Sequence, residues 1–348
     1  MITVLVVEDS PTTREFLVHI LTDAGIRVIG AVSDGEEAVR FVQRTRPDVV
    51  TMDIHMPVMD GIEATARIME TNPVPIVIVS SNWDPREVEM TFRAMEAGAL
   101  AIVRRPQGIG HPDHAATAGE LVLKVLLMSE VKVVRRWPRQ QPTIPAIANT
   151  PHSVPAIVPE SVKVVAIGAS TGGPAVLQTI LKGITLDFPA PFLIVQHMAS
   201  GFLPGMVEWL QDTSRIPIKI AAHGETVLPG HAYVAPDGFH MGVANSGKII
   251  LANEAYEHGA RPSVSYLFRS AAASYGRDAV GILLTGMGKD GAEGMKLLKE
   301  RGAVTIAQNK ETSVIYGMPA TAVELDAALY ILSPGQIVAT LTRIAIRE

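Results

Sequence analysis

The chain has 348 residues, of which 47% are hydrophobic, and a formal net charge of −5 at pH 7. This length favours two domains over one, and the apolar content is sufficient for two cores. The acidic balance offers no basic surface of the kind that nucleic-acid-binding proteins present, so we expect no nucleic-acid partner. Because there is no cysteine, thiol nucleophiles, disulfides and cysteine-ligated zinc are excluded.

The sequence carries no recognisable targeting segment. Its apolar start lacks basic residues and is followed at once by Glu8 and Asp9. Uncharged stretches of membrane length occur, for example at 140–159, but this one contains five prolines and cannot form a regular membrane-spanning helix. We therefore predict a cytoplasmic protein with no direct membrane insertion.

In the first part of the chain, short apolar runs alternate with segments of helical periodicity. This alternation predicts an α/β domain with five parallel strands and five helices, in a flavodoxin-like arrangement with right-handed crossovers. A serine and a proline at 10–11 are typical of a helix start. The clearest apolar runs of strand length are residues 2–7, 48–52, 76–79 and 100–103.

A proline-rich stretch divides the chain. Prolines recur from Trp137 to Pro159 without a helical or strand period, which is typical of a semi-extended linker. We place the first domain at 1–125, the linker at 126–160 and the second domain at 161–348.

The second part of the chain also alternates between strand and helix, and it predicts a doubly wound α/β domain. Two further short runs, at 231–235 and 249–251, are bounded by glycine-containing turns and predict a small antiparallel insertion. The predicted parallel strands are 162–167, 192–196, 279–285 and 303–307, and the predicted helices are 175–182, 206–211, 264–275 and 291–301.

Charged and polar residues follow the predicted strands of the first domain: Glu8, Asp9, Asp53, Ser80 and Arg105. The carboxyl ends of parallel strands meet at one edge of the sheet, so these side chains should converge. Clustered carboxylates favour a hard cation such as Mg²⁺, and a carboxylate oxygen can attack phosphorus. Each residue alone could simply end a strand or cap a helix, but the set in this order favours a phosphoryl site.

Residues 1–120 resemble the response-regulator receiver family. The matching pieces are VVEDS at 6–10, DIHMP at 53–57, MDG at 59–61, VSS at 79–81 and RP at 105–106. The resemblance implies that Asp53 accepts a phosphoryl group from a histidine kinase phosphodonor. It also implies a Mg²⁺ site formed by Asp9, Asp53, the backbone carbonyl of His55 and, through water, Glu8.

The same resemblance implies a switch at Ser80 and Arg105. Two positions depart from the family pattern. Arg105 stands where lysine is usual, and it binds as a planar fork rather than as a point charge. Ile102 stands near the end of the fifth strand, where an aromatic residue is often found.

The second domain begins with GASTGG at 168–173, which follows a predicted strand and satisfies the pattern G-x-S-x-G. A sharp turn from strand to helix would expose the Ser170 hydroxyl, and the helix N-terminus would offer N–H groups to an oxyanion. On this pattern alone, a glycine-rich turn that binds a phosphate, or nothing, remains an equal alternative.

A nucleophilic serine needs a base and an acid that orients the base. His197 directly follows the strand predicted at 192–196, whereas His223 follows an apolar run at 218–222 and remains a rival. Asp290 follows the strand predicted at 279–285, also at a carboxyl edge, and completes a consistent set with Ser170 and His197. The histidines in the predicted hairpin region, where a surface or core role is favoured, are His231 and His240.

Residues 160–345 resemble the chemotaxis protein-glutamate methylesterase family, CheB, and the receiver in front completes that family's architecture. The matching pieces are GASTGG at 168–173, QHM at 196–198, LPG at 228–230, AP at 235–236, RPSV at 261–264, LTGMGKDGA at 284–292 and GMP at 317–319. One departure is Ser265, where aspartate is frequent. Because it lies outside the triad, we expect it to affect substrate contacts rather than chemistry.

This second resemblance implies the roles of the site residues. Ser170 would be the nucleophile, His197 the general base and then acid, Asp290 its orienter, and the backbone N–H groups of Thr171 and Met287 the oxyanion donors. The implied substrate is a glutamate γ-methyl ester on the cytoplasmic helices of a methyl-accepting chemoreceptor, with release of methanol. Many members also deamidate glutamines, and ester hydrolysis would need no cofactor.

We hypothesise that the unphosphorylated receiver blocks access to the second domain and that phosphorylation relieves the block.

Two other functions compete with the methylesterase interpretation. A receiver fused to a generic small-molecule esterase would turn over simple esters. A non-catalytic module that binds nucleotide at 168–173 is disfavoured because no phosphate-binding glycine fingerprint occurs there. A transcription-factor output is disfavoured because there is no basic recognition helix.

Overall fold

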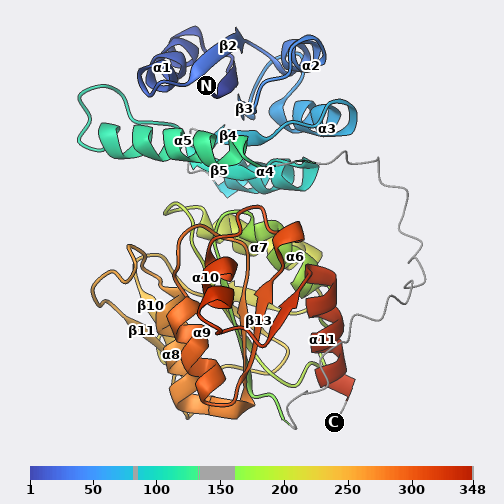
Figure 1. Cartoon of the computed structure of the whole chain (residues 1–348), viewed down its shortest axis with the longest axis vertical. Helices are drawn as coiled ribbons and strands as arrows, with labels where there is room; N and C mark the ends of the chain where they lie inside the picture. Colours follow the sequence, from blue (N-terminus) through green and yellow to red (C-terminus); the bar gives the residue numbers. More distant parts are fainter. Residues whose placement is uncertain (81–84, 132, 134–160, 347–348) are drawn as a thin grey trace. The chain divides into compact units, whose positions relative to one another are not determined.

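The computed structural model describes residues 1–80, 85–131, 133 and 161–346, and the chain divides into two compact units, Met1–Ala148 and Asn149–Glu348 (Figure 1). Most of the predicted linker lies outside the described residues, so its conformation stays a prediction. Residues 126–129 of that linker belong to the last helix of the first unit.

The first unit is a five-stranded parallel sheet with the strand order β2-β1-β3-β4-β5. Helices α1 and α5 contact each other, while α3 contacts both α2 and α4, so the helices form two layers around the sheet. The predicted five strands and five helices are confirmed. They are β1 (Thr3–Val7), α1 (Pro11–Asp23), β2 (Arg27–Val32), α2 (Gly35–Arg44), β3 (Val49–Met52), α3 (Gly61–Thr71), β4 (Ile76–Ser80), α4 (Pro85–Ala97), β5 (Ala101–Arg104) and α5 (His114–Ser129).

Local sequence signals account for the helix starts that border the acidic edge of this sheet. Ser10 caps α1 by accepting from the N–H of Thr13. Pro11 occupies the first turn, where the absence of a backbone N–H costs no helical hydrogen bond. Asp60 caps α3 in the same way, through the N–H of Glu63 at 2.8 Å. These caps fix where the loops after β1 and β3 end.

The second unit is a seven-stranded sheet with the order β14-β13-β12-β6-β7-β9-β8, and every neighbouring pair is parallel. Its strands are β6 (Val164–Ala169), β7 (Phe192–Gln196), β8 (Ile218–Ile220), β9 (Ala232–Val234), β12 (Ala279–Leu283), β13 (Val304–Gln308) and β14 (Tyr330–Leu332). Its α-helices are α6 (Gly173–Lys182), α7 (Leu203–Thr213), α8 (Val264–Tyr275), α9 (Ala292–Glu300), α10 (Met318–Glu324) and α11 (Pro334–Ile346).

The position of the antiparallel insertion corrects the sequence prediction. Residues 231–235 were assigned to it, but β9 lies in the main sheet, parallel to β7 and β8. The antiparallel pair is instead β10 (His240–Val243) with β11 (Ile249–Ala252). A three-residue strand is too short for its pattern to reveal its partner, so the error came from its closeness in sequence to a real hairpin.

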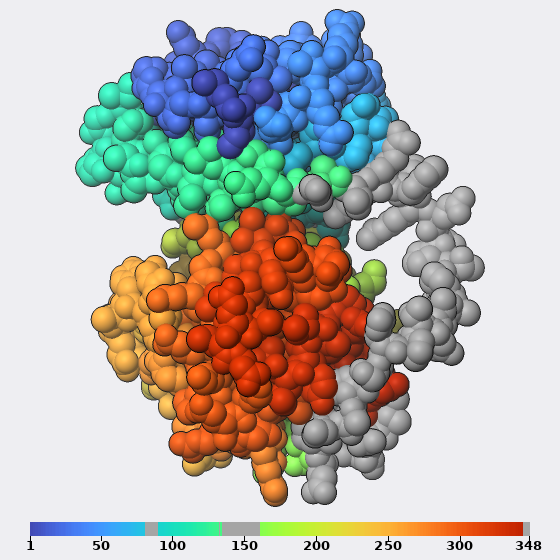
Figure 2. Space-filling model, in the orientation of Figure 1, coloured from blue at the N-terminus to red at the C-terminus, as the bar shows by residue number. Residues whose placement is uncertain are grey.

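Helices cover both faces of the second sheet. Helix α9 contacts α8 and α10, and all three contact the central strand β12. In Figure 2, orange and red atoms, the colours of these helices, close over the visible face of this unit. Helices α6, α7 and α11 form a second contacting group. None of the described helices has the length and hydropathy needed to cross a bilayer.

Candidate functional site

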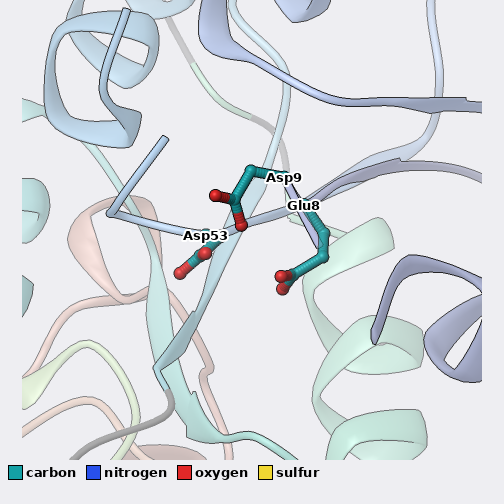
Figure 3. Close-up of side chains that lie close together, drawn as sticks. All are labelled: Glu8, Asp9 and Asp53. Atoms are coloured by element: carbon teal, nitrogen blue, oxygen red, sulfur yellow. The ribbon is translucent and has the colours of Figure 1, made fainter. Parts of the chain in front are cut away.

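Three acidic side chains meet at the carboxyl ends of β1 and β3. Glu8 and Asp9 directly follow β1, and Asp53 directly follows β3. Figure 3 shows the three side chains together, and one carboxylate oxygen from each lies within 4.8 Å of the others. The carboxylates expected to converge at this edge therefore do so.

Two members of this acidic cluster are buried with little compensating charge, while Asp9 is exposed. Glu8 is fully buried, and Asp53 is 6% exposed. Burial, followed by the charge of Asp53, raises the pKa of Glu8 to about 7, although Arg105 opposes the shift. Burial also raises the pKa of Asp53, against the opposing effects of Arg105 and the N–H of Ile54. One guanidinium thus does not offset the cost of holding these carboxylates ionised.

The predicted switch residues border the cluster. The Nη2 atom of Arg105 lies 2.9 Å from Oε2 of Glu8 and 3.5 Å from Oδ2 of Asp53. The backbone N–H of Arg105 donates to the carbonyl of Ser80 at 2.8 Å. Ser80 is the last residue of β4 and is 4% exposed, and the loop after it, 81–84, lies outside the described residues. The guanidinium pairs more closely with Glu8 than with the predicted phosphoryl acceptor.

The cluster fits a divalent oxygen-binding cation such as Mg²⁺. Carboxylate oxygens are the ligands that such an ion prefers, and its charge would supply what Arg105 alone does not. His55 lies two residues after Asp53 with an exposed side chain, and the backbone carbonyl predicted as a ligand belongs to the same loop. The loop is tightly packed, since a Cβ on Gly61 would lie 2.0 Å from the carbonyl oxygen of Asp53.

In the second unit, Ser170 occupies the turn between β6 and α6, at the carboxyl edge of the sheet. Its N–H donates to the carbonyl of Thr285 at 3.0 Å, and its own carbonyl accepts from the N–H of Gly173 at 2.8 Å. Both bonds fix the backbone of the turn while leaving the side chain half-buried. This is the strand-turn-helix context that the serine motif requires.

His197 directly follows β7, the strand next to β6, and lies against the serine turn. Its N–H donates to the carbonyl of Ala169 at 2.9 Å. Its Nε2 atom lies 3.0 Å from Oδ2 of Asp290, which is reached from the strand on the other side of β6. The described residues contain no hydrogen bond between the Ser170 hydroxyl and the imidazole. The imidazole thus lies at ion-pair distance from Asp290, although its Nε2 makes no well-oriented hydrogen bond there, and the backbone N–H of His197 bonds to the residue before Ser170.

Asp290 is held at the N-terminus of α8. Its Oδ1 accepts from the hydroxyl of Ser263 at 2.9 Å and from the N–H of Ser265 at 3.0 Å, and its Oδ2 accepts from the N–H of Val264 at 2.7 Å. Burial opposes ionisation, but His197 and the backbone donors outweigh it and hold the pKa of Asp290 below its usual value. A helix N-terminus also favours a negative charge, so this buried carboxylate stays ionised.

Sequence reasoning missed the residues that hold Asp290. Ser263 and Ser265 are both fully buried, and the Ser265 hydroxyl accepts from the N–H of Gly291 at 2.8 Å. Ser265 was expected to affect substrate contacts rather than chemistry, but it instead bonds to Asp290 and to the residue after it. The only available signal was that Ser263 follows a proline and precedes a helix, which is typical of a cap.

The other histidines lie away from this arrangement. His223 accepts from the N–H of Leu251 at 3.1 Å, and the described residues show no bond from it to the serine turn. His231 contacts the carbonyl of Pro229 at 2.8 Å. His240 is buried and accepts from the N–H of Ser263 at 3.1 Å, so it supports the cap of α8 from behind.

The two predicted oxyanion positions lie on either side of Ser170. Thr171 follows it directly and is 7% exposed, and its carbonyl accepts from the hydroxyl of Thr285 at 3.0 Å. Met287 follows Gly286, and a Cβ on Gly286 would lie only 2.6 Å from the Cβ of Ser170. The backbone at Gly286, next to Met287, therefore lies against Ser170, and the roles of the Thr171 and Met287 N–H groups as oxyanion donors stay predictions.

A cavity of about 350 Å³ opens beside the imidazole of His197. Its wall includes Asp237, Tyr256, Arg261 and Pro262. The guanidinium of Arg261 stacks on the ring of Tyr256 at 4.5 Å. Gln196 and His197 also line this space, whereas Ser170 does not, so the cavity adjoins the histidine rather than the serine.

Comparison with family models assigns both units. The model of the CheB methylesterase matches residues 165–341, and the model of the response regulator receiver domain matches residues 4–111. The matched ranges contain the serine turn with its histidine and aspartate, and the acidic cluster, respectively.

Individual proteins give the same picture over the whole chain. The chain is 56% identical to a protein-glutamate methylesterase/protein-glutamine glutaminase of Geobacter metallireducens, with 100% of both chains covered. It is 55% identical to a protein of the same description from Nitrosospira multiformis, covering 99% of this chain and 97% of the relative. The crystal structure of the Thermotoga maritima CheB methylesterase catalytic domain matches with a TM-score of 0.51 and 40% identity, covering 53% of this chain and 99% of that one.

Proposed function

Because the chain belongs to the CheB methylesterase family and carries a response regulator receiver domain at its N-terminus, we propose that it is a phosphorylation-regulated protein-glutamate methylesterase. Its substrate is a glutamate γ-methyl ester on the cytoplasmic helices of a chemoreceptor, and its products are a glutamate side chain and methanol. It acts in the cytoplasm, in the adaptation branch of chemotaxis.

The observation that carries this proposal is the contact between His197 and Asp290 beside the serine turn. The Nε2 atom lies 3.0 Å from the buried, ionised carboxylate. A neutral imidazole whose Nε2–H faces Asp290 has its lone pair on Nδ1. We assign Nδ1 as the base, because it is the ring nitrogen that Asp290 leaves free for the Ser170 hydroxyl.

The reaction has two halves. Ser170 Oγ bonds to the ester carbonyl carbon as its proton passes to His197. The tetrahedral intermediate then expels the methoxy group, which takes the proton from His197 and leaves as methanol. Water attacks the resulting acyl-enzyme with the same base, and the intermediate releases Ser170 and the glutamate carboxylate. N–H groups of Thr171 and Met287 stabilise the oxyanion in both halves, and no cofactor takes part.

The relatives' second activity fits the same machinery. An amide follows the same path, with ammonia in place of methanol as the leaving group. Ammonia requires fuller protonation by His197 before it can leave, so glutamine deamidation is the slower of the two reactions.

Regulation is assigned to Asp53. A histidine kinase donates a phosphoryl group to this carboxylate. Asp9, Asp53 and the backbone carbonyl of His55, with Glu8 through water, would hold Mg²⁺, which would supply positive charge for the transfer. Ser80 and Arg105 contact the transferred group. The unphosphorylated receiver restrains the second unit, and phosphorylation relieves that restraint.

The decisive experiment measures methanol release from methylated receptor by the wild type and by Ser170→Ala, with and without a small phosphodonor. We expect release by the wild type, more with the phosphodonor, and none by the variant. Hydrolysis of simple esters without release from receptor would favour the rival small-molecule esterase. Removal of residues 1–150 should raise the basal rate, and an unchanged rate in a folded fragment would contradict the restraint.

A further inference from the structure

Gln196, the last residue of β7, connects the two sides of the candidate catalytic site. Its side-chain Nε2 donates to the carbonyl oxygens of Ser170 and His197, both at 2.8 Å. The side chain is almost inaccessible, with Gln196 5% exposed. One amide group thus holds the backbone of the proposed nucleophile to the backbone of the proposed base.

The chemistry of the surrounding groups fixes the orientation of this amide. Both neighbours are carbonyl oxygens, which only accept hydrogen bonds, so the group between them must be the NH₂ and not the oxygen. The Oε1 atom of Gln196 then lies buried without a hydrogen-bond partner among the described residues. A buried acceptor without a partner is disfavoured, and such an atom calls for a specific reason. The two bonds made by Nε2 supply that reason.

Gly173 makes room for this amide. A Cβ at position 173 would lie 2.2 Å from Oε1 of Gln196 and 2.8 Å from the Cβ of Ala169. The φ angle of Gly173 is not positive, so its backbone conformation does not itself call for glycine. Space, rather than conformational freedom, therefore explains glycine at the last position of the GASTGG stretch, since a methyl group there would meet both the Gln196 amide and the Cβ of Ala169.

We propose that Gln196 and Gly173 form a positioning pair that sets the placement of Ser170 relative to His197. Gln196 acts through the backbone of both residues, and Gly173 acts by admitting its amide. The inference rests on the proposed function, because it assumes that Ser170 and His197 are the reacting pair. It explains why a glutamine precedes His197 and why a glycine begins the helix after Ser170.

The first test removes the amide while nearly preserving its length. In the full-length protein, Gln196→Met should lower kcat for methanol release by about 10–10²-fold, because a small misplacement of reacting groups costs this much. KM should change less than kcat, because Gln196 lines the cavity beside His197 but spends its side-chain donors on the two backbone carbonyls. The rate at which a small fluorophosphonate labels Ser170 should fall by the same factor as kcat.

The second test approaches the same contact from the other side. Gly173→Ala should lower kcat and the labelling rate comparably, because its methyl group displaces the amide. In a Gln196→Ala background the same substitution should have a smaller effect, because the amide it would displace is gone and only the contact with the Cβ of Ala169, at 2.8 Å, remains. Gly335→Ala is the matched control. It also adds a methyl group in the first turn of a helix, α11, but meets no atom within 4 Å, so kcat should be unchanged.

Near-ultraviolet circular dichroism and thermal unfolding would check that each variant is folded. A folded Gln196→Met protein with wild-type kcat would refute the inference, as would equal effects of Gly173→Ala in the wild-type and Gln196→Ala backgrounds. If the wild type released no methanol from receptor, the proposed function would fail. The labelling rates of the same variants would still decide whether Gln196 and Gly173 position Ser170.

Discussion

The two units of this chain use buried carboxylates in opposite ways. Glu8 and Asp53 lie at the end of the receiver sheet, where burial and mutual repulsion raise their pKa values. Asp290 lies at the end of the methylesterase sheet, where an imidazole and the donors at a helix N-terminus lower its pKa despite burial. The fold class and the strand-end location are the same, so the difference comes from the local donors.

This contrast matches what each carboxylate is proposed to do. A carboxylate that must attack phosphorus and bind a metal ion has to keep an oxygen available, and among the described residues Asp53 has only one backbone donor, the N–H of Ile54 on Oδ1 at 2.8 Å, where Asp290 has two. A carboxylate that must orient a histidine gains from being fixed, because it never leaves its partner. Carboxylates with few hydrogen-bond donors are thus suited to binding a cation. A carboxylate whose oxygens are all hydrogen-bonded is suited to orienting a neighbouring catalytic residue.

The largest expected effect separates the two sites completely. Ser170→Ala should lower methanol release by about 10⁶-fold, as loss of a serine nucleophile does in comparable triads. Phosphorylation of Asp53 by a small phosphodonor, followed by mass spectrometry, should be unchanged in this variant. The reciprocal variant, Asp53→Asn, should keep basal ester hydrolysis and lose its response to the phosphodonor. Loss of both activities in either folded variant would show that the sites are not separable.

The second-largest expected effect concerns Asp290, the carboxylate that is held by several hydrogen-bond donors. Asp290→Asn keeps the shape of the side chain but removes the charge that orients and stabilises the His197 imidazolium. We expect kcat to fall by about 10⁴-fold with a smaller change in KM. A loss of less than about tenfold in steady-state kinetics would contradict the role of Asp290 as the orienting acid.

The stability of the two sites should depend on pH with opposite sign. Glu8 has a folded pKa of about 7, against 4.5 for its ordinary value. Stability is therefore lost as the pH rises through this window, and Glu8→Gln should become more stable than the wild type by roughly 3 kcal/mol above it. Asp290 has a folded pKa below its ordinary 3.8. The advantage of the wild type over Asp290→Asn is therefore full above about pH 4 and is lost at lower pH.

Scanning calorimetry of the full chain without divalent ions would measure both differences. The receiver transition can be recognised by its shift on addition of Mg²⁺. Glu8→Gln and the wild type could instead be equally stable from about pH 5 to about pH 8, where Glu8 changes its charge. That result would show that the charge of Glu8 is better neutralised in the folded protein than its surroundings indicate.

The smallest of these effects is the response to the metal itself. At about 100 times its dissociation constant, Mg²⁺ should stabilise the receiver by about 2.7 kcal/mol. Asp9→Asn removes a proposed direct ligand and should abolish most of this gain, while Asp23→Asn, an exposed change at the end of α1, should not. A thermal shift that is equal in both variants would exclude Asp9 as a ligand.

The sequence predicted the features that depend on strand ends. Asp53 and Glu8 could be placed together because the carboxyl ends of parallel strands share an edge, whichever strands are neighbours. The same rule placed His197 and Asp290 near Ser170, and the sheet order explains why it worked, since β7 and β12 both flank β6. The roles of these residues stay predictions until the kinetics are measured.

The features that depend on lateral order and side-chain direction could not be predicted. The strand at 232–234 was misassigned because three residues carry no usable alternation. The bonds of Ser263 to Asp290 and of Gln196 to Ser170 join residues 27 and 26 positions apart. Local propensity holds no information about such contacts. Only the folded structure shows which helix cap or strand end also forms a hydrogen bond to a residue of the site.

The ion pair between Arg105 and Glu8 gives the receiver an internal competitor. An arginine keeps its charge at any physiological pH, so Glu8 always has a counter-ion available 2.9 Å away. A metal ion that recruits Glu8 must first exchange with this tethered guanidinium. Arg105 and Mg²⁺ therefore compete for the same carboxylate. The free Mg²⁺ concentration at which the acidic pocket fills is set by this competition within the protein as well as by the surrounding solution.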